Sequence, residues 1–197
     1  MNRYAVVWGI RGTRGDSIAG DNNGRLFARL LSRLYGYDKR NIRALIGNQL
    51  SYESAVESLS WVRDSSDDSS TVILFYSGHG GPNSAGLFSQ TFLDYLLSDI
   101  KYDKLCMIFE SCYSGNACEP LSGDNRLIIA STQVGKVGPT TAHDSPFGNY
   151  FLRDAIKMGL GDSNQDGKVS MQEAFYYYQM KTNGWGTMSD NCGEFIP

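Results

Sequence analysis

The sequence predicts an α/β fold, a three-layer α/β/α sandwich in which helices cover both faces of a mostly parallel β-sheet. Five short apolar runs carry this prediction because they are continuous, as in strands buried on both faces, and do not alternate with polar residues. They cover residues 4–8, 42–46, 72–76, 105–109 and 127–130. The stretches between the runs are long enough for helices, which indicates repeated strand, helix, strand units.

The segments between these runs have helical patterns. Residues 25–34 carry apolar side chains at helical spacing, and residues 147–158 form a further amphipathic segment. Ser51 and Ser89 each precede an apolar helical pattern and are predicted N-caps. A sixth, short strand is expected near the carboxyl end. Because we find no internal repeat and no domain boundary, residues 1–197 are expected to form a single domain.

The composition excludes several classes of protein. The 197 residues include 18 Lys+Arg and 21 Asp+Glu, a net charge of −3 without a basic block, so no nucleic-acid or anionic-membrane partner is expected. With 41% hydrophobic and 20% charged residues the chain is not intrinsically disordered. No apolar run approaches the ~20 residues that span a bilayer. The amino end reads directly as a strand, so the sequence as written indicates a cytoplasmic protein, or a secreted one if a signal peptide has been removed.

The four cysteines differ in their surroundings. They are too sparse for a disulfide scaffold, and their spacing fits no zinc site. Cys106 lies inside an apolar run and is predicted to be a core residue. Cys118 and Cys192 lie in polar, Gly-rich stretches and could be free or bridged. Cys112 follows the end of an apolar run in a turn-rich segment, which makes it the candidate for chemistry.

Reactive residues follow two of the predicted strands. His79 lies among glycines after the run 72–76, and Cys112 follows the run 105–109. If these strands are neighbours, both residues face one crevice at the carboxyl edge of the sheet. A nearby histidine favours the thiolate, and glycines let a backbone N–H approach a substrate closely, as an oxyanion donor must. Taken singly, the alternatives are a structural histidine and a core cysteine.

The two motifs are Tyr76-Ser77-Gly78-His79-Gly80-Gly81 and Glu110-Ser111-Cys112-Tyr113-Ser114-Gly115. In this order they resemble the His and Cys motifs of caspase-fold cysteine peptidases, which include caspases, metacaspases and legumains. The His motif is metacaspase-like, whereas Glu110, where metacaspases carry Asp, is legumain-like. The resemblance covers about residues 3–160. It implies a caspase-like sandwich with a six-stranded sheet, peptide or protein substrates, His79 as general acid/base, Cys112 as nucleophile and an oxyanion hole from the amides of Gly80 and Cys112.

The resemblance also implies a specificity pocket near the exit of the first strand and beside the nucleophile. Asp21 and Glu110 occupy such positions, and Asp144 is expected at the pocket rim. Legumains pair their acidic residue with an Arg, but the corresponding position holds Ser17. Two carboxylates in a partly desolvated pocket need a cation, so we predict cleavage after Arg or Lys. The alternative is a legumain-like Asn-specific peptidase or transpeptidase.

Residues 162–173 match the twelve-residue EF-hand loop, with Gly at position 6 and an apolar residue at position 8. The expected ligands are Asp162, Asn164, Asp166, the backbone carbonyl of Lys168, Ser170 directly or through water, and Glu173 with both oxygens. The motif predicts a structural or modulatory Ca²⁺ ion, with no cofactor needed for the chemical step. The alternatives are a polar loop that binds nothing and, for the whole chain, a calcium-binding caspase-like regulatory or adaptor domain without activity.

Residues 133–145 are rich in Gly and Thr and are predicted to form an exposed, flexible loop. Related enzymes process a linker after the catalytic cysteine. Lys136 is the one basic residue of this segment, so self-cleavage after Lys136 is expected.

Overall fold

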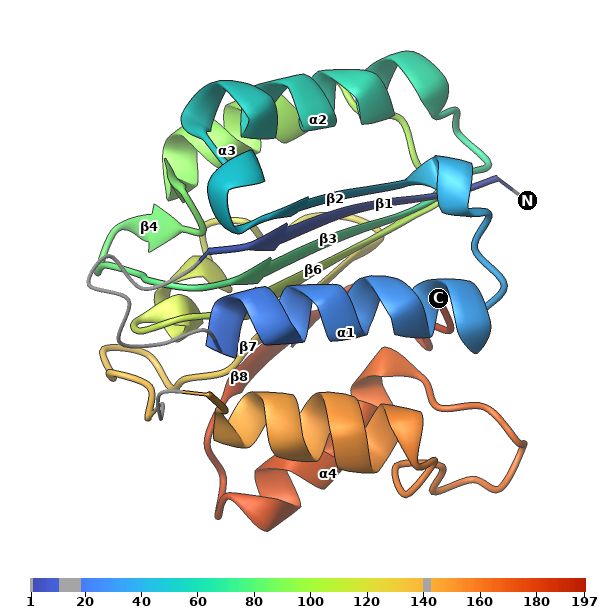
Figure 1. Cartoon of the computed structure of the whole chain (residues 1–197), viewed down its shortest axis with the longest axis vertical. Helices are drawn as coiled ribbons and strands as arrows, with labels where there is room; N and C mark the ends of the chain where they lie inside the picture. The colour runs from blue at the N-terminus through green and yellow to red at the C-terminus, as the bar shows by residue number, and fades with distance from the viewer. Residues whose placement is uncertain (1, 11–18, 140–142) are drawn as a thin grey trace.

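The computed structural model describes residues 2–10, 19–139 and 143–197, and a six-stranded sheet forms its centre (Figure 1). The strand order is β2-β1-β3-β6-β7-β8. The strands are β1 (Arg3–Gly9), β2 (Ile42–Ile46), β3 (Thr71–Ser77), β6 (Lys104–Glu110), β7 (Arg126–Ala130) and β8 (Thr187–Asp190). Neighbours from β2 to β7 pair in parallel, and only the short β8 pairs antiparallel, with β7. The predicted fold class is therefore confirmed.

Helices cover both faces of this sheet, which gives three layers (Figure 1). The longer helices are α1 (Ala19–Arg33), α2 (Tyr52–Ser65), α3 (Gln90–Leu97), the π-helix η4 (Phe147–Lys157) and α4 (Met171–Lys181). The shorter elements are η1 (Lys39–Asn41), η2 (Gly47–Gln49), η3 (Ser114–Ala117) and the hairpin β4 (Ser84–Ala85) and β5 (Phe88–Ser89). In Figure 1, α2 and α3 lie on one face, and α1 and α4 lie on the other. None of the helices among the described residues is long and apolar enough to cross a membrane.

The strands β1, β3, β6 and β7 each contribute to two hydrophobic cores, which explains why their apolar runs are continuous. Along β1, Val7 packs in the core under α1, η4 and α4, whereas Trp8 packs in the core under α2 and α3. Cys106 of β6 is fully buried in the first of these cores, as predicted. The N-caps Ser51 and Ser89 also form as predicted, and each accepts a backbone hydrogen bond from the first turn of its helix.

The main departure from the predicted elements is at the start of α1, which begins at Ala19 and not at residue 25. Its first turn holds glycine, asparagine and aspartate, which are poor helix formers. Close packing requires the glycines at positions 20 and 24. A Cβ at Gly20 would lie 2.4 Å from the Ile10 carbonyl oxygen, and one at Gly24 would lie 2.7 Å from the Ile46 side chain. Small residues therefore let α1 approach the ends of β1 and β2.

Candidate active site

The pairing of β3 with β6 brings the two reactive motifs together. Ser77, the last residue of β3, lies opposite Glu110, the last residue of β6. The Gly78 amide continues the ladder by donating to the Glu110 carbonyl (3.0 Å). The expectation that these strands are neighbours is thus confirmed. His79 and Cys112 both line a cavity of about 100 Å³ at this edge, His79 exposed and Cys112 partly exposed.

The loop that carries His79 is pressed against the loop that carries Cys112. A Cβ at Gly80 would lie 2.2 Å from the Cys112 carbonyl oxygen and 2.6 Å from Ser111 Oγ, too close for any side chain. The Tyr76 hydroxyl donates to the His79 carbonyl (2.7 Å) and fixes the same loop from inside the sheet. Glycine at position 80 is therefore required for the approach of the two motifs.

Several backbone amides among the described residues at this contact form no hydrogen bond within the protein. Four nearby amides donate within the protein: Gly78 to Glu110 O (3.0 Å), Gly81 to Ser84 Oγ (2.7 Å), Ser111 to Ser131 Oγ (3.2 Å) and Tyr113 to Lys136 O (2.7 Å). In contrast, the amides of His79, Gly80 and Cys112 have no acceptor within the described part of the chain, and those of Gly80 and Cys112 are the expected oxyanion donors. Unpaired N–H groups beside a thiol are what an oxyanion hole needs.

Hydroxyl groups hold the turn that follows Cys112. Tyr113 has a left-handed backbone (φ 59°), which turns the chain sharply away from the strand direction. Ser114 Oγ then lies 3.0 Å from Thr132 Oγ1 and 3.4 Å from Ser131 Oγ, both just after β7. This network connects the cysteine loop to the end of β7. The position of Cys112 therefore depends on both β6 and β7.

Glu110 is a buried carboxylate that lines the same cavity. Asn23 Nδ2 donates to both of its oxygens (3.0 Å each), Ser77 Oγ donates to Oε2 (2.6 Å), and Ser145 Oγ donates to Oε1. Burial raises the pKa of Glu110 above its ordinary value, while these hydrogen bonds and the charge of Arg153 act in the opposite direction.

The other two acidic residues expected at the pocket lie apart from it. Asp21 lies beside Gly47 at the end of β2, where its Oδ2 is 3.2 Å from the position of a Gly47 Cβ. Asp144 forms an ion pair with Arg153 (2.6 Å). Neither is among the described residues that line the cavity, which include neighbours of both, namely Gly20 and Ser145. Ser17, the position that replaces the legumain Arg, lies outside the described residues.

The family model of the caspase domain, Peptidase C14, matches residues 2–184, which contain both motifs. The chain belongs to the caspase-domain family of peptidases. Its fold is similar to that of protein GSU0716 from Geobacter sulfurreducens, whose crystal structure matches with a TM-score of 0.73 at 15% sequence identity, over 96% of this chain and 92% of that chain. Comparison with curated proteins gives no match. The resemblance to caspase-fold peptidases inferred from the two motifs is therefore confirmed.

Within this caspase domain, the sequence did not indicate three polar side chains that contact Glu110. Asn23, Ser77 and Ser145 come from α1, β3 and the start of η4, and long-range folding brings them to one carboxylate. Ser145 had a local signal, because a serine just before an amphipathic segment is a capping residue. Its Oγ does accept from the Gly148 amide (2.8 Å).

The EF-hand-like loop of this caspase domain lies between η4 and α4, as the motif requires. Gly167 has a left-handed backbone (φ 84°), and Ser170 is the N-cap of α4 in a capping box with Glu173. The Asp162 carboxylate accepts from the Gly167 amide (3.0 Å), and Glu173 accepts from the amides of Ser163 (3.0 Å) and Ser170 (2.9 Å).

The donor set of this loop fits calcium chemically, because it offers carboxylate, amide and hydroxyl oxygens. Its carboxylates, however, face the amides of the loop itself. Among the described residues, no three acidic, histidine or cysteine side chains lie close enough together to hold a metal ion. Calcium binding therefore requires the side chains of Asp162, Asp166 and Glu173 to draw closer together.

The four cysteines carry free thiols. Cys118 is buried and donates to the Thr187 carbonyl (3.7 Å), while Cys192 lies near the carboxyl end and contacts the Gly193 carbonyl (3.3 Å). The alternative left open by the sequence, a bridge between these two residues, is not formed. Only the thiol of Cys112 lines the cavity that also contains a histidine.

Proposed function

We propose that the chain is a cysteine endopeptidase in which Cys112 is the nucleophile and His79 the general acid/base. The observation that supports this most directly is that both side chains follow the paired ends of β3 and β6 and line one cavity. Membership of a peptidase family supports it further. The amides of Gly80 and Cys112, without acceptors among the described residues, suit the role of oxyanion donors.

The chemistry then proceeds in two steps. His79 takes the proton of the Cys112 thiol, and the sulfur attacks the carbonyl carbon of the scissile peptide bond. The carbonyl π electrons move to the oxygen, which the two amides stabilise. As the C–N bond breaks, His79 gives its proton to the leaving amine. Water, deprotonated by His79, hydrolyses the thioester and frees Cys112.

The experiment that tests this proposal combines single and double variants. Cys112→Ala and His79→Ala should each lower kcat/KM on fluorogenic peptides by several orders of magnitude, and the double variant should be no worse, because the two residues act as a unit. Cys192→Ala and His143→Ala are the matched controls, since neither residue lines the cavity. Appreciable turnover by Cys112→Ala would contradict the mechanism.

The same measurements separate the alternatives. If the unaltered protein hydrolyses no member of a peptide library and no peptide electrophile labels Cys112, the chain is a regulatory or adaptor domain. If products carry an added amine in place of water, the covalent intermediate is used for transpeptidation. Labelling of Cys112 that disappears in His79→Ala supports the peptidase.

We also propose cleavage after Arg or Lys. Of the carboxylates considered, Glu110 lines the cavity, and no Lys or Arg is among the described lining residues. A basic substrate side chain would supply the missing cation, with Asp21 and Asp144 acting at longer range. Glu110→Gln should lower kcat/KM for Arg substrates by about 30-fold or more, since truncating a desolvated charge pair costs about 2 kcal/mol or more. Turnover of Asn substrates should change much less.

Two comparisons decide this specificity. Asp21→Asn removes the same charge outside the cavity lining and should have a smaller effect than Glu110→Gln. Efficient cleavage after Asn with none after Arg would favour the legumain-like alternative. That result would contradict the proposed Arg or Lys specificity but not the proposed roles of Cys112 and His79.

We propose further that residues 162–173 bind one Ca²⁺ ion in a structural or modulatory role. The supporting observations are the oxygen donor set and the loop geometry around Gly167. Calcium should raise the melting temperature relative to chelator, because it binds only the folded state. Asp162→Ala should remove this shift, and Asp124→Ala, an exposed acid elsewhere, should keep it. Identical melting curves of the unaltered protein in both conditions would reject the site.

Self-processing after Lys136 remains part of the proposal. Lys136 is exposed, and its carbonyl accepts the amide of Tyr113 (2.7 Å), next to the nucleophile. Intact mass spectrometry should detect a nick after Lys136 in active protein and none in Cys112→Ala. A single full-length mass in both would exclude self-cleavage here.

A further inference from the structure

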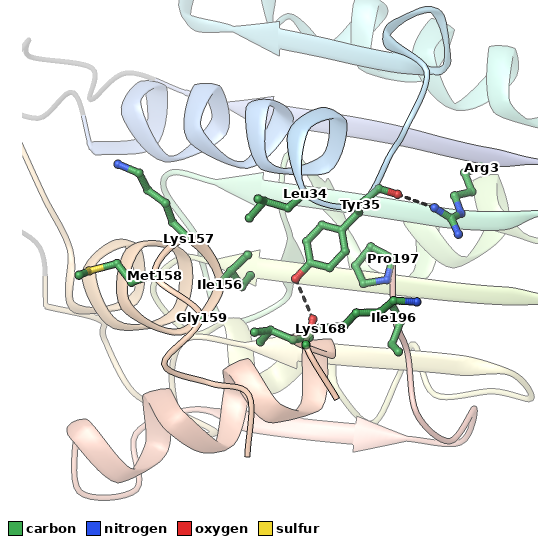
Figure 2. A pocket seen from close by; sticks show the side chains of 12 residues that line it. Arg3, Leu34, Tyr35, Ile156, Lys157, Met158, Gly159, Lys168, Ile196 and Pro197 are labelled. Carbon is green, nitrogen blue, oxygen red and sulfur yellow. Dashed lines mark hydrogen bonds between the residues drawn. The ribbon is translucent and has the colours of Figure 1, made fainter. Parts of the chain in front are cut away.

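A second cavity, of about 330 Å³, lies at the opposite edge of the sheet from the proposed peptidase site. It is bordered by Arg3 at the start of β1, whereas His79 and Cys112 follow the carboxyl ends of strands parallel to β1. The end of α1, the end of η4 and the last residues of the chain form its walls (Figure 2). No step of the proposed peptide hydrolysis uses this cavity.

The described charged side chains that line the cavity are all basic. Arg3, Lys157 and Lys168 line it, and no Asp or Glu is among its described lining residues. A neighbouring cavity of about 360 Å³ shares Lys157 and adds Arg29 and Arg33, again without a described acidic residue. None of these five cations forms an ion pair with an acidic side chain among the described residues, while Arg3 donates to the Tyr35 carbonyl and lies over the Tyr37 ring. In a chain of net charge −3, such a cluster attracts anions to one region of the surface.

The remaining walls of the cavity are mainly apolar, and buried side chains and a hydrogen bond hold them in place. Ile156 and Val169 are buried at the cavity, while the side chains of Leu34 and Met158 are exposed to solvent beside it. The Tyr35 hydroxyl donates to the Val169 carbonyl (2.7 Å), so α1 is fixed to the segment after η4 (Figure 2). The volume falls within the range of about 300–1,000 Å³ that small-molecule sites occupy.

Exposed apolar side chains beside cations that form no ion pair with a described residue suit one kind of ligand. An anionic group gains from Arg3, Lys157 and Lys168, and an apolar chain gains by covering Leu34. The neighbouring cavity also contains Leu34, so its apolar lining continues from the first cavity along α1. We propose that this cavity binds an amphipathic anion, a small molecule with a carboxylate, phosphate or sulfate head and an apolar chain. The site is independent of the proposed peptidase function.

The first experiment varies the charge of the ligand and the charge of the cavity. Calorimetric titration with monomeric dodecanoate should show saturable binding, and dodecyltrimethylammonium, with the same chain and opposite charge, should not bind. Lys157→Gln/Lys168→Gln should weaken dodecanoate binding by about tenfold or more. Lys39→Gln/Lys101→Gln removes the same charge at exposed positions outside the cavity and should leave the affinity unchanged. Equal losses in both double variants would mean attraction by net charge alone and would overturn the proposal.

Separate experiments test the contribution of the apolar lining and whether the ligand is a free small molecule or a membrane lipid. Leu34→Gln should weaken dodecanoate binding, while Met180→Gln, a similarly exposed change on α4, should not. Acetate, which lacks the chain, should bind much more weakly than dodecanoate. Binding to vesicles of phosphatidylserine without saturable binding of free dodecanoate would identify a membrane-contacting surface and refute a small-molecule site. Absence of binding to either probe would refute it as well.

Discussion

Replacing Gly80 by Ala tests whether the contact between the two motif loops sets the geometry of catalysis. The added Cβ would lie 2.2 Å from the Cys112 carbonyl oxygen, whereas ordinary contacts begin near 3.4 Å. The obstacle is backbone, so the loops must separate by about 1 Å, a displacement that costs about 100-fold when it misplaces reacting groups. Gly80→Ala should therefore lower kcat/KM by about 100-fold and destabilise the fold by about 1–3 kcal/mol, as overpacking does.

The adjacent glycine supplies the control. A Cβ at Gly81 would meet only Ser84 Oγ, at 3.8 Å, which is an ordinary contact. Gly81→Ala should therefore keep most of the activity. Peptide hydrolysis and the rate of Cys112 alkylation by an electrophilic peptide should be measured on both variants, together with urea denaturation. If Gly80→Ala is folded and as active as Gly81→Ala, the contact does not set the catalytic geometry.

Four further outcomes are expected. Cys106→Ala should leave kcat/KM unchanged but lower the free energy of unfolding by about 1–3 kcal/mol in urea denaturation, because a fully buried side chain is truncated. Ser51→Ala removes the N-cap of α2 and should cost about 1 kcal/mol by the same assay, again with activity retained. Because burial raises the pKa of Glu110, kcat/KM for Arg substrates should fall on acidification at a higher pH than an ordinary glutamate would give, and an Asn substrate should lack this step. The same shift lowers stability as pH rises through the folded-state pKa of Glu110, so the stability of Glu110→Gln relative to the unaltered protein should increase across that range.

Much of the fold could be predicted because local and long-range preferences agree in this chain. The strand β2 has the predicted bounds, Ile42–Ile46, and the helix η4, Phe147–Lys157, covers the amphipathic segment predicted over residues 147–158. The first turn of α1 was missed because its residues are selected for close approach to β1 and not for helix propensity. The hairpin of β4 and β5 was missed because two-residue strands leave no measurable pattern.

The candidate site also has one part that could be predicted from the sequence and one part that could not. His79 and Cys112 could be brought together from sequence, since parallel neighbouring strands end at one edge. The placement of Asp21 and Asp144 could not, because side-chain direction depends on partners such as Arg153 that the sequence does not reveal. The same holds for the cation cluster around the second cavity, whose members come from distant parts of the chain.

The environment of Glu110 explains how a buried carboxylate can take part in the site at all. Its hydrogen-bond donors come from β3 (Ser77), α1 (Asn23) and the start of η4 (Ser145), so the carboxylate links the sheet to one helical layer. Every one of these groups donates to an oxygen, which favours the ionised form against the cost of burial. Glu110 also ends the strand two residues before Cys112. Changes that alter its length, unlike Glu110→Gln, should therefore affect both the pocket and the position of the nucleophile.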